Sequence, residues 1–229
     1  MRCLMCGTVI TEDHFSDFFR KKDVLCASCR GSWKPIRQKT VFFGKPAYFL
    51  YEYNEAFSHC LIQFKECGDE ALKSVFLYPE KEALRRRFAG CTFLLLPSSE
   101  EKRRARGFSH LALMFEILHL PMLEPFEKTV HADQKALGRR GRVRMSESIR
   151  LKEGVRLPKK IVLADDVLTT GATMKGALSC LPKKAEVRVF ACALVKERSR
   201  RTNLECGFSA GYNEHADDES GGFYYGYDI

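Results

Sequence analysis

The sequence predicts an α/β protein with a largely parallel sheet flanked by helices and a small cysteine-marked segment ahead of it. Apolar, strand-like runs alternate with stretches of helical periodicity, which is typical of crossover units and parallel strands. Two runs, FLLLP and KIVLA, are continuously apolar, as expected for strands covered on both faces. Two Cys-x-x-Cys pairs near the N-terminus indicate a separate small module.

Composition divides the chain into three parts. Residues 1–46 are polar and cysteine-marked, with too few apolar side chains to fold by burial alone. Residues 47–203 form the α/β domain. Residues 204–229 are an acidic, aromatic C-terminal tail that we expect to be disordered; a tail that folds back on the basic body is the alternative.

Seven elements of the α/β domain can be placed in order along the chain. The strands are expected at 48–53, 91–97, 160–166 and 187–195, and the helices at 54–66, 107–120 and 173–181.

Charge is distributed unevenly along the chain. All 38 Lys and Arg residues precede Asn203, together with 23 of the 29 acidic residues, so this part carries 38 minus 23, or +15. Such a field favours polyanions or phosphorylated small molecules, the alternative being a solvated basic surface. The sequence begins without a secretory signal pattern and has no apolar run long enough to span a bilayer, which predicts a cytoplasmic protein without membrane insertion.

The four N-terminal cysteines have the spacing of a metal site. Cys3 and Cys6 form one pair and Cys26 and Cys29 the other, so that four thiolates can surround one ion tetrahedrally. Gly7 gives the first knuckle a permissive backbone. We predict a structural Zn²⁺ site, with a redox dithiol as the alternative.

The stretch KIVLADDVLTTGAT combines two carboxylates with a loop suited to an anion. Asp165 and Asp166 end an apolar strand, and the loop then leads into a helix whose first backbone N–H groups favour a phosphate. Carboxylates repel phosphate, so the pair is expected to bind ribose hydroxyls or Mg²⁺ instead. An ordinary strand end, turn and helix cap is the alternative interpretation.

This stretch closely resembles the phosphoribosyl-pyrophosphate motif of type I phosphoribosyltransferases, which have a parallel sheet and a smaller hood. The resemblance implies that Asp165 and Asp166 bind the ribose hydroxyls and that the loop binds the 5′-phosphate, with Mg²⁺ accompanying phosphoribosyl pyrophosphate. The implied loop residues are Leu168, Thr169, Thr170, Gly171, Ala172 and Thr173.

Together with the cysteine pairs, the motif resembles the late-competence ComF (ComFC-type) family, which is associated with DNA uptake during natural transformation. The resemblance includes LPSSEEKRRARGF, but this chain has Ser109 and His110 where the family usually has Asn-Gln, and Met145 where Asn is common. These departures concern the acceptor side of the implied site.

Two basic segments are further candidates. The first follows the strand at 91–97 and falls where the family binds pyrophosphate; its candidate residues are Lys102, Arg103, Arg104 and Arg106. A solvated basic face at a helix start is the alternative, although arginines there would oppose the helix dipole. The second is a glycine-punctuated loop that could close over pyrophosphate or track nucleic acid, with Arg139, Arg140 and Arg142 as candidates.

Two hypotheses about function remain open. One is a Mg²⁺-dependent phosphoribosyltransferase acting on a nitrogenous acceptor; the other is a noncatalytic protein of the DNA-uptake machinery that binds phosphoribosyl pyrophosphate or single-stranded DNA and contacts a competence helicase. The sequence shows no Ser-His-Asp or Cys-His arrangement, so catalytic residues are unassigned.

Overall fold

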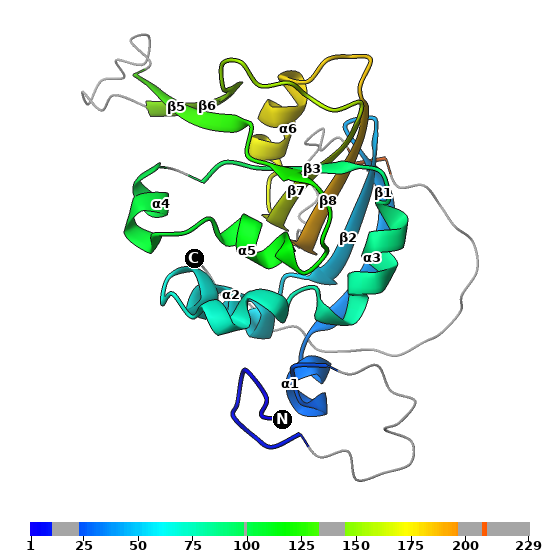
Figure 1. The fold of residues 1–229 in the computed structure, drawn as a ribbon, viewed down its shortest axis with the longest axis vertical. Helices are drawn as coiled ribbons and strands as arrows, with labels where there is room; N and C mark the ends of the chain where they lie inside the picture. Colours follow the sequence, from blue (N-terminus) through cyan, green and yellow to red (C-terminus); the bar gives the residue numbers. More distant parts are fainter. Residues whose placement is uncertain (11–22, 99, 133–144, 197–207, 210–229) are drawn as a thin grey trace, which may run out of the picture.

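A central sheet organises the protein (Figure 1). The structure is a computed structural model, and it describes residues 1–10, 23–98, 100–132, 145–196 and 208–209. Within these residues the sheet has seven strands in the order β4-β3-β7-β8-β2-β1-β9. In that order the strands are β4 (Met122–Leu123), β3 (Thr92–Leu95), β7 (Lys160–Leu168), β8 (Glu186–Leu194), β2 (Lys45–Glu52), β1 (Lys34–Phe42) and β9 (Phe208–Ser209).

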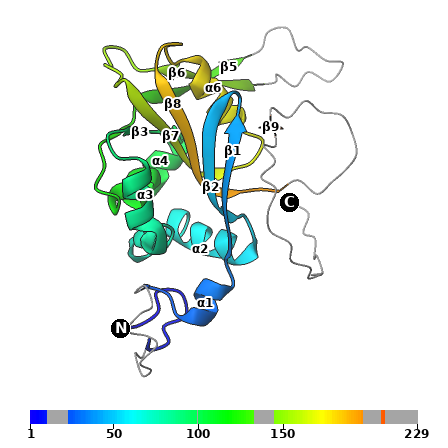
Figure 2. The same ribbon diagram turned by 90° about the vertical axis from the view of Figure 1, so that its right-hand side faces the viewer.

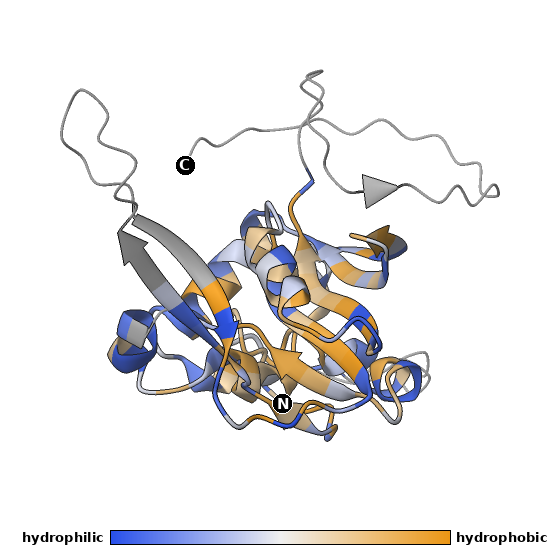
Figure 3. Ribbon diagram, turned by 90° about the horizontal axis from the view of Figure 1, so that it is seen from above, coloured by the Kyte–Doolittle hydropathy of each residue, from blue (hydrophilic) through white to orange (hydrophobic). Residues whose placement is uncertain are grey.

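The first five strands of that order, β4 to β2, run parallel to one another. Residues 161–164 of β7 and 189–193 of β8 are fully buried, because helices and connecting segments cover both faces. Seen from above, the central strands are hydrophobic and the hydrophilic residues gather on the surrounding elements (Figure 3). The predicted α/β class with a largely parallel sheet is confirmed.

β1 adds an antiparallel edge to the sheet. It pairs with β2 through a tight turn in which Phe43 and Gly44 both have positive φ, at 46° and 72°. The short strand β9 in turn pairs with β1, Val41 opposite Ser209 and Phe42 opposite Phe208. The boundary predicted at residue 46 therefore falls inside the sheet, after β1; the rest of the C-terminal tail lies outside the described residues.

Short helices and 3₁₀ turns surround the sheet (Figure 1). They are α1 (Ala27–Gly31), α2 (Glu55–Lys65), η2 (Glu70–Ser74), η3 (Tyr78–Glu80), α3 (Lys81–Arg87), α4 (Glu100–Arg106), α5 (His110–Glu116) and α6 (Ala172–Ser179). α2 begins where the side chain of Asn54 accepts a hydrogen bond from the backbone N–H of Phe57 at 3.0 Å, the usual helix cap. The predicted helices at 54–66, 107–120 and 173–181 correspond to α2, α5 and α6.

Aromatic packing joins the N-terminal segment to the sheet. Trp33 is buried, with its ring centroid 4.8 Å from that of Phe57 and 5.1 Å from that of Tyr51. Arg30 stacks on Trp33 and donates a hydrogen bond to the carbonyl of Val75 at 2.8 Å. These contacts hold the cysteine-bearing segment against the body.

A separate antiparallel ribbon stands at the opposite end of the molecule. It consists of β5 (Phe126–Ala132) and β6 (Met145–Leu151). Both ribbon views place it next to α6, far from α1 and the N-terminus (Figures 1 and 2). Ile149 of β6 lies close to Gly176 of α6, so the ribbon packs on the helix that follows the acid pair.

Candidate functional site

The acid pair lies at a branching point of the sheet. β3 and β7 are neighbours, but the chain leaves β3 toward β4 and leaves β7 toward β8, on opposite sides. Pairing between β3 and β7 ends with the hydrogen bond from Leu96 N to Ala164 O, whereas β7 continues along β8 as far as Leu168. Such a divergence opens a crevice at the carboxyl ends of parallel strands, where ligands of open α/β sheets bind.

The loop after β7 makes a tight turn into α6. Gly171 caps the helix with φ 74° and ψ 8°, in the left-handed region that glycine adopts without strain. A Cβ atom at this position would lie 2.5 Å from Cζ of Phe42, so glycine is also needed for space. The predicted role of Gly171 in a tight turn agrees with this geometry.

The other loop residues differ in exposure, and of them Thr173 lines the crevice. Leu168 is buried, so its side chain belongs to the core. Thr169, Thr170 and Ala172 are exposed, and the Ala172 N–H donates to Thr170 Oγ1 at 3.4 Å. Thr173 lines the same hollow as the two aspartates. The acid pair and the last residue of the predicted loop therefore meet in one hollow.

That hollow, the acid-pair cleft, has a volume of about 230 Å³. Its lining is Lys65, Leu96, Pro97, Ser98, Lys102, Arg106, His110, Leu111, Lys128, Asp165, Asp166 and Thr173. Four cationic side chains face two carboxyl groups, so the lining carries a net charge of +2 even with both acids ionised. This balance suits a ligand with several negative charges.

Asp166 is held by two side chains from distant parts of the chain. Its Oδ2 forms an ion pair with Nζ of Lys65 and a 3.0 Å hydrogen bond with Nε2 of His110, and its Oδ1 accepts from the Val167 N–H at 2.6 Å. The Asp166 side chain is only 8% exposed. Sequence reasoning missed Lys65 and noted His110 only as a departure from the family pattern.

The two aspartates have opposite shifts in pKa. Burial and the charge of Asp166 raise the pKa of Asp165. Burial also acts to raise the pKa of Asp166, but the charge of Lys65 and the hydrogen bond from His110 outweigh it, and the pKa falls well below its usual range. The charge on Asp166 is thus neutralised by Lys65, and Asp165 resists ionisation. The pair therefore presents less negative charge to an anion in the crevice than two free carboxylates would.

His110 is fixed in one tautomer by its neighbours. Its Nδ1 lies 3.1 Å from a guanidinium nitrogen of Arg106, which can only donate, so Nδ1 accepts and Nε2 carries the proton donated to Asp166. Burial lowers the pKa of His110, and the charges of Lys65 and Arg106 act in the same direction. Arg106 is itself paired with Glu66 at 3.0 Å. The imidazole of His110 is therefore neutral, and it positions the ionised Asp166 through the hydrogen bond from Nε2.

The first basic segment divides between two places. Lys102 and Arg106 line the acid-pair cleft. Arg103 lines an adjoining hollow and pairs with Glu124 at 3.4 Å, and Arg104 is exposed, outside both linings. Contrary to the prediction from the sequence, the arginines do not lie at a helix start: α4 begins at Glu100 and they occupy its last turn, where the helix dipole favours them.

The adjoining hollow, here called the ribbon pocket, has a volume of about 160 Å³. It shares Ser98 and His110 with the acid-pair cleft and extends along Phe108 and Ser109 to the start of β5, where Phe126, Glu127 and Lys128 line it. The departures Ser109 and His110 thus both lie in its wall. The basic loop with Arg139, Arg140 and Arg142 lies outside the described residues, and Met145 is described only as part of β6.

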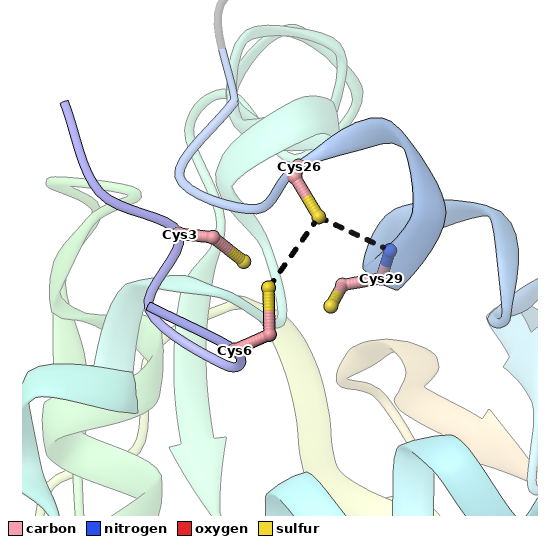
Figure 4. A group of neighbouring side chains, drawn as sticks. All are labelled: Cys3, Cys6, Cys26 and Cys29. Carbon is pink, nitrogen blue, oxygen red and sulfur yellow. Dashed lines mark hydrogen bonds between the residues drawn. The ribbon is translucent and has the colours of Figure 1, made fainter. Parts of the chain in front are cut away.

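The four N-terminal cysteines converge on one point (Figure 4). Their sulfur atoms all lie within 4.8 Å of one another, and Sγ of Cys6 is 3.7 Å from Sγ of Cys26. A zinc ion with four Zn–S bonds of about 2.3 Å places its sulfurs about 3.8 Å apart. The cluster could therefore hold a metal ion such as zinc.

Local backbone structure builds this cluster. In the first knuckle the Cys3 N–H donates to the Thr8 carbonyl at 2.8 Å, and Gly7 adopts φ 73°, as predicted. In the second knuckle Cys26 caps α1, and its sulfur accepts from the Cys29 N–H at 3.5 Å. Four protein thiolates leave no open position, which fits a structural rather than a catalytic ion.

The fold and the two sites define an α/β protein with a cationic cleft at the branching point of its sheet and a four-cysteine cluster at its N-terminus. No helix in the part of the chain that the structure describes is both long and apolar enough to cross a membrane. No protein-family model matches the chain.

Two curated proteins are similar to it in sequence. "Competence protein ComFC" of Streptococcus pneumoniae is 26% identical over 221 residues, covering 86% of this chain and 100% of the relative. "Competence protein ComFC" of Bacillus subtilis is 29% identical over 140 residues, covering 60% of this chain and 58% of the relative. The resemblance to ComF proteins that the motifs predicted is confirmed by these homologues.

Proposed function

We propose that the protein binds phosphoribosyl pyrophosphate in the acid-pair cleft and serves DNA uptake during natural transformation. The observation that carries the ligand is the meeting of Asp165, Asp166 and Thr173 in one cleft of net positive charge at the branching point of the sheet. The names of the two homologues support the role in competence.

Each part of the cleft matches one part of this ligand. The backbone N–H groups and hydroxyls of residues 169–173 would hold the 5′-phosphate, at the start of α6. Asp165, which lines the cleft, would accept hydrogen bonds from ribose hydroxyls. Lys102 and Arg106 would hold the pyrophosphate. Mg²⁺ would accompany the ligand, because carboxylate and phosphate oxygens are its preferred partners.

A transfer reaction would displace pyrophosphate from ribose C1 in favour of a nitrogenous acceptor. Positioning and charge neutralisation of the leaving group by Lys102 and Arg106 are the contributions that the residues of the cleft can make. The ribbon pocket supports this hypothesis because it adjoins the cleft through Ser98 and His110.

The second candidate is a noncatalytic protein that keeps the ligand site and acts as an adaptor of the uptake machinery, bound to single-stranded DNA or to a helicase. It is supported by the internal pairing of Asp166 with Lys65 and His110, which commits one of the two acids before any ligand arrives. In both cases we propose a cytoplasmic protein whose Cys3, Cys6, Cys26 and Cys29 hold a structural Zn²⁺.

Thermal unfolding with added ligands tests the proposal. Phosphoribosyl pyrophosphate with Mg²⁺ should raise the melting temperature of the wild-type protein, and Asp165→Asn should reduce this shift without preventing folding. A wild-type protein that is unaffected by the ligand at millimolar concentration would refute the binding function. Pyrophosphate release with a panel of nitrogenous bases then separates the candidates, since an adaptor binds the ligand but releases none.

A salt series tests the DNA-binding alternative. The affinity for a fluorescent single strand of DNA should fall steeply as the salt concentration rises. Replacing Arg139, Arg140 and Arg142 by alanine should lower the affinity and make this dependence on salt less steep. An unchanged affinity in the triple variant would exclude that loop from DNA binding.

A further inference from the structure

The side chain of Lys65 reaches into the acid-pair cleft from a part of the chain that no motif marks. Lys65 is the last residue of α2, and its ammonium forms an ion pair with Asp166 while lining the cleft beside Lys102 and Arg106. Resting on the function proposed above, we propose that Lys65 is a ligand-binding residue that contacts the pyrophosphate end of the ligand.

Pairing with Asp166 does not by itself account for a lysine at this place. Asp166 already accepts hydrogen bonds from His110 at Oδ2 and from Val167 at Oδ1. Bringing an ammonium out of water costs several kcal/mol, so a buried ion pair is weak evidence of a gain in stability. The Lys65 side chain is nevertheless only 19% exposed. A second, anionic partner in the cleft would account for a lysine ammonium held at this position.

The ammonium has donors to spare for such a partner. Lysine carries three N–H donors, and the ion pair with Asp166 uses one of them. Because Lys65 lines the cleft, the oxygens of an incoming phosphate could accept hydrogen bonds from its remaining N–H groups. Asp166 then acts as a positioning residue that holds Lys65 in place, and Asp165 is the acid that meets the ribose hydroxyls.

The position of α2 selects the end of the ligand that Lys65 serves. α6, whose start would hold the 5′-phosphate, lies toward the β5–β6 ribbon, whereas α2 lies toward the cysteine cluster in both ribbon views (Figures 1 and 2). Lys65 also lies beside Glu66, which pairs with Arg106. Lys65, Lys102 and Arg106 share the cleft lining with Thr173 of the loop, and we assign these three cations to the pyrophosphate.

Calorimetric titration of Lys65→Met tests this assignment with two ligands. Mg²⁺-phosphoribosyl pyrophosphate should bind about tenfold or more weakly than to the wild type, the usual loss for a charge-assisted hydrogen bond. Ribose 5-phosphate, which lacks the pyrophosphate, should keep its affinity within about twofold. Lys73→Met is the matched control, because its ion pair with Glu116 at 2.8 Å is exposed and involves no residue of the cleft lining.

Three outcomes of the titration are distinguishable. Equal losses for both ligands, or no loss for either, overturn the assignment of Lys65. A wild-type protein that binds neither ligand instead refutes the proposed function itself. A selective loss for phosphoribosyl pyrophosphate with an unchanged Lys73→Met control supports the assignment.

NMR of the wild-type protein gives the same answer if Lys65→Met does not fold. The ¹⁵Nζ resonance of Lys65, assigned by its absence in Lys65→Arg, should shift on addition of phosphoribosyl pyrophosphate and stay in place with ribose 5-phosphate. A resonance that responds to neither ligand, or equally to both, contradicts a specific contact with the pyrophosphate.

Discussion

Replacing Gly171 by alanine should destabilise the protein and displace the loop that precedes α6, for two separable reasons. Gly171 has φ 74°, where an L-residue with a Cβ atom loses about 1–2 kcal/mol. The new Cβ would also lie 2.5 Å and 2.9 Å from two ring carbons of Phe42. Overpacking of this kind typically costs about 1–3 kcal/mol. The expected loss is therefore about 2–5 kcal/mol in total.

The clash cannot be relieved by a simple movement of the ring. Phe42 is 1% exposed, its ring packs against Phe43 at a centroid distance of 4.7 Å, and its backbone is paired on both sides, with β2 and with β9. The loop is the softer partner, so we expect residues 169–171 to be displaced. Affinity for phosphoribosyl pyrophosphate should fall with the stability.

The chain offers a matched control in Gly154. It has nearly the same φ, 73°, but a Cβ atom built there meets nothing within 4 Å. Gly154→Ala should therefore cost only the backbone strain, about 1–2 kcal/mol. Urea unfolding of both variants, fitted with the same m value, measures the difference between their free energies of unfolding. Equal losses in the two variants, or a loss in Gly171→Ala that Phe42→Leu does not partly relieve, would refute the packing argument.

Three further predictions concern the acids and the cysteine cluster. Asp166→Asn removes the carboxylate that pairs with the half-buried ammonium of Lys65 and should lower the free energy of unfolding by about 1–3 kcal/mol in urea; a loss below about 1 kcal/mol would show that the ion pair is not formed in solution. The pKa of Asp165 is raised from 3.8 to about 8 in the folded protein, so the folded state binds this proton more tightly than the unfolded chain and stability is lost as pH rises through that interval. Asp165→Asn removes this pH-dependent loss, so the free energy of unfolding of the variant should rise relative to that of the wild type between pH 5 and pH 8. A difference between the two proteins that stays constant with pH would contradict the raised pKa. Elemental analysis should find about one zinc per chain in the purified protein. Cys26→Ser should lose this zinc and melt at a lower temperature, whereas Cys67→Ser, at an exposed cysteine outside the cluster, should retain it.

Features encoded by neighbouring residues were predictable from the sequence. The run KIVLA, the acid pair and Gly171 follow one another along the chain, and β7, the tight turn and α6 follow in the same order. The cysteine cluster was predictable for a similar reason, because each Cys-x-x-Cys pair forms its own knuckle. β7 extends to Leu168, further than the apolar run indicated, because β8 continues to pair with it after β3 has diverged.

Contacts between distant segments were not predictable. His110 and Asp166 are separated by 56 positions, and Lys65 is further away still, so no spacing rule connects them. Lys65 ends an amphipathic helix, where a basic residue is commonplace. Only the arrangement of α2, α5 and β7 in space shows that the three side chains meet.

Of two missed elements, α4 left a signal in the sequence and β1 did not. Residues 100–106 place glutamates before arginines, the usual charge order along a helix, which would have located the start of α4 correctly. In β1 the burial of side chains alternates from Ile36 to Phe42, as in a strand with one exposed face, but Gln38 and Thr40 on its more buried side are polar. Its polar face masked the strand within the cysteine-marked segment.

The central claim is that the acid-pair cleft binds a phosphorylated ribose. A crystal structure with Mg²⁺ and phosphoribosyl pyrophosphate tests it most directly. We predict the 5′-phosphate against the backbone of residues 169–173, ribose hydroxyls within hydrogen-bond distance of Asp165, and pyrophosphate oxygens on Lys65, Lys102 and Arg106. A ligand bound elsewhere on the protein, with Asp165 and Thr173 making no contact to it, would contradict the account.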